Sequence, residues 1–155
     1  MEKLKRIASF SVDHDLIDEG IYISRIDGDI TTYDMRTRRP NMGDYMDNLT
    51  MHSVEHLFAT YVRCSSIGEN IIYFGPMGCQ TGFYLLVRDV PKEDVLVCVK
   101  DVLRKIIDHE GEMPGAKREE CGNYLNLSLD AAKKECKRYL DVLCGRVCDF
   151  KYKDA

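Results

Sequence analysis

Apolar and polar residues alternate in four segments that have the composition of β-strands. These segments occur in two pairs: 20–26 with 29–36, and 70–75 with 82–88. Asp27-Gly28 lies between the first two segments, and Asp-Gly between alternating apolar runs is a strong signal for a β-hairpin. The second pair is joined by a short connection that begins at Pro76. The pattern therefore predicts two hairpins.

Helical spacing of apolar residues occurs in three further segments: about 50–65, 91–109 and 128–143. Proline is favoured in the first turn of a helix, as at Pro91, and Ser128 can cap the third helix. The resulting order is ββ-α-ββ-α-α. It predicts an α+β fold, a two-layer sandwich of a mostly antiparallel sheet with helices. No long linker interrupts the pattern, so residues 1–155 are expected to form a single domain.

Composition narrows the class of protein. The 155 residues are 45% apolar and 31% charged, as in soluble globular proteins, and the formal net charge of −4 leaves no basic surface for nucleic acid. No apolar run approaches the length of a membrane span. The N-terminal residues lack the apolar core of a signal peptide. We therefore expect a cytoplasmic protein with no nucleic-acid or membrane partner.

Seven cysteines are present, an odd number without an export signal, which favours reduced thiols. Cys98 and Cys136 lie inside helical patterns and are expected to be buried. The Cys144-x-x-x-Cys148 pair could form a disulfide or bind metal, but it has no second half elsewhere in the chain, so both roles are disfavoured.

The segment His52-Ser-Val-Glu55-His56 carries the most specific chemistry. Two histidines four residues apart lie on one face of a helix and can bind one metal ion. Glu55 shares that face, where it can transfer protons beside the metal. Ala59 and Arg63 continue the same stripe, so it offers a small residue and then an anion-binding group. A solvated helix face would more often mix lysine and glutamate, which disfavours the alternative of two accidental histidines.

Two histidines are not a complete site, and the sequence leaves the third ligand open. Cys121 lies in an irregular glycine-containing loop, and Cys79 follows a tight turn at residues 76–78. His14 and His109 are the other histidines. Two classes of metalloprotein fit. One is the H-x-x-E-H metallopeptidase, in which the glutamate activates water; the other is a small metal-dependent lyase or isomerase that uses Glu and Cys as acid–base groups.

The chain resembles the LuxS family of S-ribosylhomocysteine lyases. Five motifs occur in the family's order: Ser9-Phe10-Ser11-Val12-Asp13-His14, Tyr33-Asp34-Met35-Arg36, His52-Ser53-Val54-Glu55-His56-Leu57 with Arg63, Pro76-Met77-Gly78-Cys79-Gln80-Thr81-Gly82-Phe83-Tyr84, and Cys121-Gly122. These resemble S-F-x-x-D-H, F-D-x-R, H-T-L-E-H-L, P-M-G-C-x-T-G-[FY]-Y and C-G. The resemblance covers nearly the whole chain.

The resemblance implies a role for each motif residue. His52, His56 and Cys121 would bind one divalent metal per subunit, most often Fe(II), with zinc or cobalt as replacements. Cys79 and Glu55 would be the two acid–base groups. Four residues would line the substrate pocket: Ser9, His14, Arg36 and Arg63.

The resemblance also implies an α+β fold, a homodimer with active sites at the subunit interface, and a known reaction. Members of the family cleave the thioether of S-ribosylhomocysteine to homocysteine and 4,5-dihydroxy-2,3-pentanedione. The second product is the precursor of autoinducer-2 in quorum sensing, and the first returns to the methyl cycle. A metallopeptidase-like hydrolase, a divergent lyase with an altered substrate and a degenerate metal-binding protein remain the alternatives.

The sequence departs from the family in the segments after the first strand pair and after residue 110, and in the motif before Met77. The family's D-I-S-P is here Tyr73-Phe74-Gly75-Pro76, so an acidic residue that could bind the substrate's ammonium group is missing. Among the charged residues near the site, Arg38 and Arg39 lie two and three positions after Arg36 and are expected to be solvated.

Overall fold

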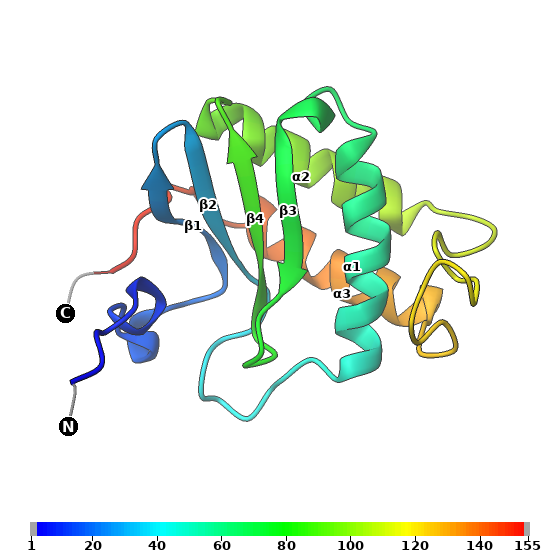
Figure 1. Cartoon of the computed structure of the whole chain (residues 1–155), viewed down its shortest axis with the longest axis horizontal. Coiled ribbons are helices and arrows are strands. Elements are labelled where there is room, and N and C mark those ends of the chain that lie inside the picture. The colour runs from blue at the N-terminus through cyan, green and yellow to red at the C-terminus, as the bar shows by residue number, and fades with distance from the viewer. Residues whose placement is uncertain (1–2, 154–155) are drawn as a thin grey trace.

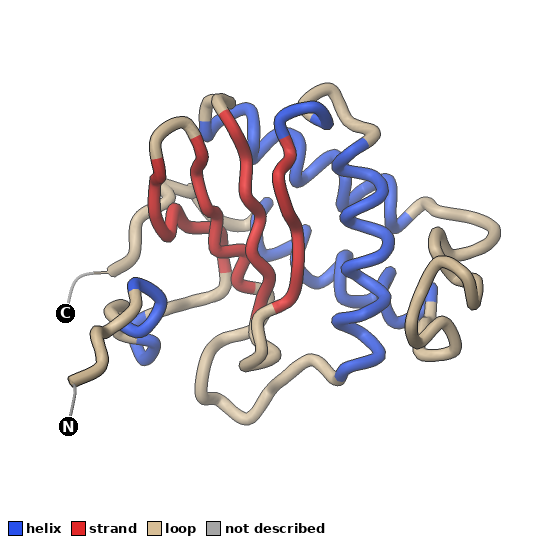
Figure 2. Tube along the Cα trace, in the orientation of Figure 1, coloured by secondary structure: helices blue, strands red, loops and turns tan. Residues whose placement is uncertain are grey.

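The computed structural model describes residues 3–153. Four strands and three α-helices follow one another in the predicted order (Figures 1 and 2). Their bounds are β1 Gly20–Asp27, β2 Ile30–Arg36, α1 Asn48–Arg63, β3 Ile71–Pro76, β4 Gly82–Arg88, α2 Lys92–Ile107 and α3 Leu129–Cys144. Short 3-10 helices occur at Ala8–Phe10, His14–Leu16 and Gly68–Asn70. The predicted element order is confirmed.

The strands form one antiparallel sheet in the order β1-β2-β4-β3. The two strands of each predicted hairpin pair with each other, β1 with β2 and β3 with β4. Pairing of β2 with β4 joins the two hairpins into one sheet. The first turn lies one residue later than Asp27-Gly28, because Asp27 still pairs with Ile30. The two turn residues are Gly28 and Asp29, and Gly28 has a φ of 62°, which suits a glycine at the first turn position.

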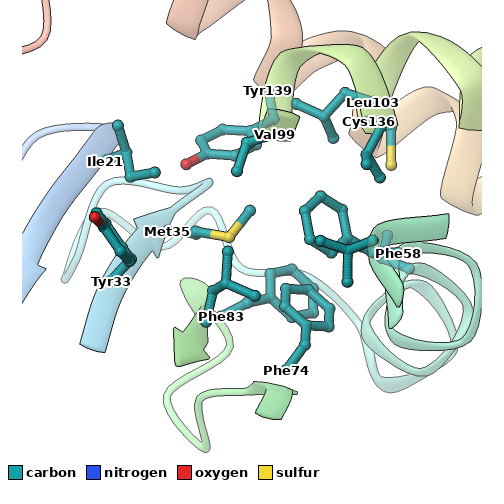
Figure 3. Packing of buried hydrophobic residues seen from close by; sticks show 14 of the residues in the cluster. Ile21, Tyr33, Met35, Phe58, Phe74, Phe83, Val99, Leu103, Cys136 and Tyr139 are labelled. Carbon is teal, nitrogen blue, oxygen red and sulfur yellow. The ribbon is translucent and has the colours of Figure 1, made fainter. Parts of the chain in front are cut away.

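All three helices pack on one face of the sheet, which makes the predicted two-layer α+β arrangement (Figure 1). Side chains from both layers interlock between them, as Figure 3 shows for Met35 and Phe83 of the sheet beneath Tyr139 and Val99 of the helices. Phe74 stacks on Phe83 with ring centroids 5.0 Å apart. Burial of this apolar surface is the main force that holds α1 in a fixed position on the sheet.

Helix α1 begins two residues before its predicted start. The side chain of Asp47 accepts a hydrogen bond of 2.8 Å from the backbone N–H of Thr50, so Asp47 caps the helix. Ser128 caps α3 as predicted, through the N–H of Ala131. The two caps fix where α1 begins and where the loop that precedes α3 ends.

The opposite face of the sheet carries polar residues, and no α-helix of residues 3–153 packs on it. Successive residues of a strand point to opposite faces, so Asp34 and Arg36 lie on the far side from Tyr33 and Met35. Both charged residues are nevertheless buried, with 1% and 2% of their surface exposed. The N-terminal segment and the C-terminal tail, residues 147–153, lie near this side of the sheet at β1 (Figure 1).

The expected solvation of Arg38 is wrong, whereas Arg39 is half exposed as expected. The Arg38 guanidinium donates two hydrogen bonds, of 2.9 and 2.7 Å, to the carboxylate of Glu135 in α3. Glu135 is itself buried, so the pair joins the end of β2 to α3. The sequence around Arg38 did not predict this ion pair, because Glu135 lies 97 residues further along the chain.

The cysteines and the helices agree with two further expectations. All seven cysteines are free thiols, and Cys98 and Cys136 are the buried ones. Burial raises the pKa of the Cys98 and Cys136 thiols, so both remain protonated and inert. Within residues 3–153, none of the helices has the length and apolar content needed to cross a membrane.

Candidate metal centre

Three side chains from α1 and the loop after α2 meet at one point. The ligand atoms of His52, His56 and Cys121 all lie within 4.8 Å of one another. His52 Nε2 and Cys121 Sγ are 3.4 Å apart. On a tetrahedral ion, a nitrogen and a thiolate ligand lie about 3.5 Å apart, so the observed spacing fits a shared ion. In the described part of the chain, these three residues form a group that could hold a metal ion, and Cys121 occupies the third position that the sequence had left open.

Backbone carbonyls of the same loop orient both imidazole rings. His52 Nδ1 donates to the carbonyl oxygen of Asn126 at 2.8 Å, and His56 Nδ1 donates to that of Pro114 at 2.9 Å. A carbonyl oxygen can only accept, so Nδ1 carries the proton and Nε2 keeps its lone pair. Each Nε2 is therefore free to bind a metal, and the outer hydrogen bond fixes the ring as metal sites require.

Gly115 lets the loop approach His56 closely. Its φ is 70°, and a Cβ built at this position would lie 2.8 Å from His56 Nδ1. A larger residue would displace the ring from this position and strain the backbone. The backbone N–H of Asn123 donates to the Cys121 sulfur at 3.4 Å and so helps to hold this side chain in place.

Glu55 lies beside this group in a small open cavity. The cavity is lined by His52 and Glu55 of α1, Pro76 at the end of β3, and Asn123 and Asn126 of the loop. Glu55 is half buried and faces a space that borders His52 on one side and Pro76, at the end of β3, on the other. The carboxylate is thus placed to exchange protons with a molecule in that cavity.

Cys79 lies in the β3–β4 turn, three residues after Pro76, and its side chain is exposed. Its sulfur is 3.0 Å from the hydroxyl oxygen of Thr81 and 4.0 Å from Arg36 Nη1. Arg36 Nη1 also donates to the Thr81 hydroxyl at 2.8 Å. The thiol therefore lies beside a buried positive charge, an arrangement typical of reactive cysteines.

Asp34 keeps Arg36 charged. Burial of the guanidinium opposes its charge, but hydrogen bonds and attraction to Asp34 outweigh this, and the pKa of Arg36 is raised above its ordinary value. The ion pair is bidentate, with Arg36 Nε and Nη2 at 3.0 and 2.7 Å from the two carboxylate oxygens. Arg36 is thus a buried and oriented cation, unlike the solvated charge usual at a strand end.

Three other predicted site residues lie outside this cavity. Ser9 lines a groove with Tyr73 and Tyr84 on the open face of the sheet. His14 begins a 3-10 helix and its Nδ1 lies 2.9 Å from the carbonyl oxygen of Val12. Arg63 is exposed at the end of α1, where its guanidinium donates to the Ile71 carbonyl at 3.5 Å. Within one chain, these residues are not brought to the metal ligands.

The remaining candidates for the third ligand are accounted for by their contacts. His109 has both ring nitrogens engaged, with Tyr61 Oη at 2.7 Å and the Glu112 carbonyl at 2.9 Å. Cys79 is absent from the three-residue metal-ligand group. Sequence reasoning missed Asn126 and Pro114, which contribute backbone oxygens, and no side-chain pattern could have identified them.

Tyr73 occupies the sequence position at which the family has an acidic residue. It is half exposed on the open face of the sheet, and its hydroxyl oxygen would lie 2.1 Å from a Cβ on Gly75. The phenol therefore occupies the space that a serine at position 75 would need. The departures from D-I-S-P at positions 73 and 75 are therefore sterically linked.

Comparison with known proteins gives a consistent result. Residues 7–146 match the family model described as S-ribosylhomocysteinase (LuxS). An S-ribosylhomocysteine lyase of Finegoldia magna is 41% identical over 145 residues, which cover 90% of this chain and 92% of the relative. Another, from Phocaeicola vulgatus, is 43% identical over 143 residues, covering 88% and 89%. One from Borreliella burgdorferi is 40% identical over 146 residues, covering 90% and 93%.

Proposed function

The chain belongs to the S-ribosylhomocysteinase (LuxS) family of carbon–sulfur lyases, and on this basis we propose that it cleaves the thioether of S-ribosylhomocysteine. The products would be homocysteine and 4,5-dihydroxy-2,3-pentanedione, the autoinducer-2 precursor. The single observation that carries this proposal is the convergence of His52, His56 and Cys121 beside Glu55. A set of metal ligands, a carboxylate and a cavity together provide what proton transfer on an aldose substrate would require.

We propose one divalent metal per subunit, with Fe(II) as the working ion and zinc or cobalt as replacements. His52 and His56 would bind it through Nε2 and Cys121 through Sγ. When bound, the ion supplies a Lewis acid that polarises the carbonyl of the substrate. Seven free cysteines suit a reducing compartment, from which we infer a cytoplasmic location.

Glu55 and Cys79 would divide the proton transfers between them. In each shift, a proton would be removed from the carbon beside the carbonyl and returned to the former carbonyl carbon, while a hydroxyl proton passes between the two oxygens. Two such shifts would move the substrate carbonyl from C1 to C2 and then to C3. Removal of the C4 proton would then expel the sulfur at C5, the thiolate would take up a proton to leave as homocysteine, and the remaining enol would become the diketone. Arg36 would support Cys79 as a base by its positive charge, and the other polar residues would hold the hydroxyl groups and the amino-acid end of the substrate.

The first prediction is the reaction itself. Anaerobically purified protein loaded with Fe(II) or Co(II) should release free homocysteine from S-ribosylhomocysteine, detected with a chromogenic thiol reagent. Protein carrying Glu55→Gln should keep its metal and lose about a hundredfold or more in kcat, because an amide cannot accept the proton.

The alternatives give different results in the same assay. Peptide cleavage without homocysteine release would favour the H-x-x-E-H hydrolase. Full metal occupancy without either activity would favour a protein that binds metal without turnover. Release of thiol from a related sugar thioether, but not from S-ribosylhomocysteine, would identify an altered substrate, for which Tyr73 is the first residue to test.

We further propose a homodimer in which each active site takes residues from both subunits. The support is that the N-terminal segment, which contains His14, lies at the β1 side of the molecule, away from α1 (Figure 1), and that Ser9 lines a groove on the open side of the sheet. That side also exposes apolar side chains, including Ile7 at 54% and Tyr73 at 52%. A second copy placed against this surface would bury them and supply Ser9 and His14 to its partner's cavity.

Mixed dimers test this arrangement. His14→Ala and Glu55→Gln should each be nearly inactive as pure dimers. Co-expressed with different tags, they should recover about a quarter of wild-type activity, because half of the dimers are mixed and each mixed dimer has one intact site. Light scattering should report a dimer for both variants. If the mixture stays inactive, or the protein is a monomer, this part of the proposal is wrong.

A further inference from the structure

The C-terminal tail, residues 147–153, makes specific contacts with the sheet and lies beyond the residues that match the family model. The match ends at residue 146, and the described tail continues to Lys153. Phe150 is buried at 5% exposure, and its carbonyl oxygen accepts a hydrogen bond of 2.9 Å from the N–H of Ile23 in β1. Lys153 forms an ion pair with Asp18. These contacts hold the tail against the edge of the sheet on both sides of Tyr152.

Tyr152 is the tail residue that reaches the polar face of the sheet. Its ring stacks on Tyr22 with centroids 4.9 Å apart and planes 14° apart. Its hydroxyl donates a hydrogen bond of 2.7 Å to Asp34 Oδ2. Burial and the charge of Asp34 raise the pKa of Tyr152, so the phenol stays protonated and remains a donor. The tail thereby closes over a carboxylate that is 1% exposed.

Asp34 connects Tyr152 to Arg36, because it accepts hydrogen bonds from both. The oxygen that accepts from Tyr152 also accepts from Arg36 Nη2 at 2.7 Å, and the other oxygen accepts from Arg36 Nε. Two parallel bonds fix the plane of a guanidinium. With Nε and Nη2 engaged, Nη1 is the group that faces Thr81 and Cys79.

We propose that Tyr152 is a positioning residue for Cys79, acting through Asp34 and Arg36. Its hydroxyl holds the carboxylate in place and shares its negative charge, so more of the positive charge of Arg36 acts on the sulfur. Tyr152 itself does not touch Cys79 in this structure and is not a catalytic residue. The proposal rests on the role of Cys79 in the proposed function, but the state of the Cys79 thiol can be measured without turnover.

The test compares Tyr152→Phe with Tyr22→Phe. The first keeps the stacked ring and removes the bond to Asp34. The second keeps the same stack and removes a hydroxyl that donates to the Asp18 carbonyl at 2.9 Å. Alkylation of Cys79 by iodoacetamide at pH 7 should slow about three- to fivefold in Tyr152→Phe and stay unchanged in Tyr22→Phe, because alkylation requires the thiolate. Mass spectrometry would resolve each cysteine, with exposed Cys64 as the internal reference.

The kinetic readout is a separate arm. In Tyr152→Phe, kcat should fall about three- to tenfold while KM changes less than about twofold, because the proposed role of Tyr152 is to position Cys79 and not to bind the substrate. Thermal unfolding would establish that both variants are folded. Equal alkylation rates in the two variants would overturn the proposal, as would a slowing of Cys64 together with Cys79. If alkylation slows as expected but the wild-type protein lacks lyase activity, the proposed function fails and the positioning of Cys79 stands.

Discussion

Replacing Cys121 by alanine is expected to lower the metal content from about one ion per chain to less than about a tenth of that. The substitution removes the thiolate, which is one of three protein ligands, and leaves two histidines on one helix. Lyase activity should fall by at least the same factor. Elemental analysis of anaerobically purified protein measures the loss directly, and cobalt-loaded protein should lose its sulfur-to-metal charge-transfer band.

Cys144→Ala is the matched control, because Cys144 is also a free thiol but is exposed at the end of α3. It should keep full metal content and activity. Cys121→Ser distinguishes loss of the sulfur from loss of volume, and it too should lose most of its metal. Full occupancy in Cys121→Ala, or equal loss in the control, would contradict the assignment of Cys121 as a ligand.

Cys79→Ala is expected to show the opposite combination, with normal metal content and a kcat reduced by about a thousandfold. Cys79 is exposed in the β3–β4 turn and belongs to the Thr81–Arg36 cluster, so its removal leaves His52, His56 and Cys121 intact. What is lost is the proposed acid–base group opposite Glu55. A stopped assay of homocysteine release, with metal measured on the same sample, reads both quantities.

Exposed Cys64, at the end of α1, provides the control for Cys79. Cys64→Ala should be as active as the wild type. If Cys79→Ala retains more than about a tenth of the activity, Cys79 is not a principal proton carrier. If it loses metal as completely as Cys121→Ala, the separate roles of the two cysteines are wrong.

The sequence predicted the elements well because each has a local signal. Alternation identified the strands, and helical spacing identified α1 with its two histidines on one face. The misplaced boundaries have local causes that the pattern did not weigh. Asp47 caps α1 before the apolar stripe begins, and Asp27 remains in β1 because Gly28 and Asp29 make the turn.

The buried polar contacts could not be predicted in the same way. Arg36 and Arg38 look like surface charges in the sequence, but Arg36 pairs with Asp34 on the same buried face of β2 and Arg38 pairs with Glu135 in α3. Tyr152 follows no periodic pattern, and 118 residues separate it from its partner Asp34. Such pairs form because a buried charge is costly unless it is paired, a requirement that operates only once the fold has brought the partners together.

The loop that carries Cys121 is held on α1 by the two histidines as well as through its thiol. Its carbonyls at Pro114 and Asn126 accept from His56 and His52, and the N–H of Ser128 donates to Ser53 Oγ at 2.8 Å. The chain entropy of this long loop is therefore given up during folding and not when an ion arrives. Because the ligands are already assembled, little of the free energy of metal coordination is spent on ordering the loop, and more of it contributes to affinity. One thiolate and two imidazoles can then retain even a divalent ion that such ligands bind weakly, such as Fe(II).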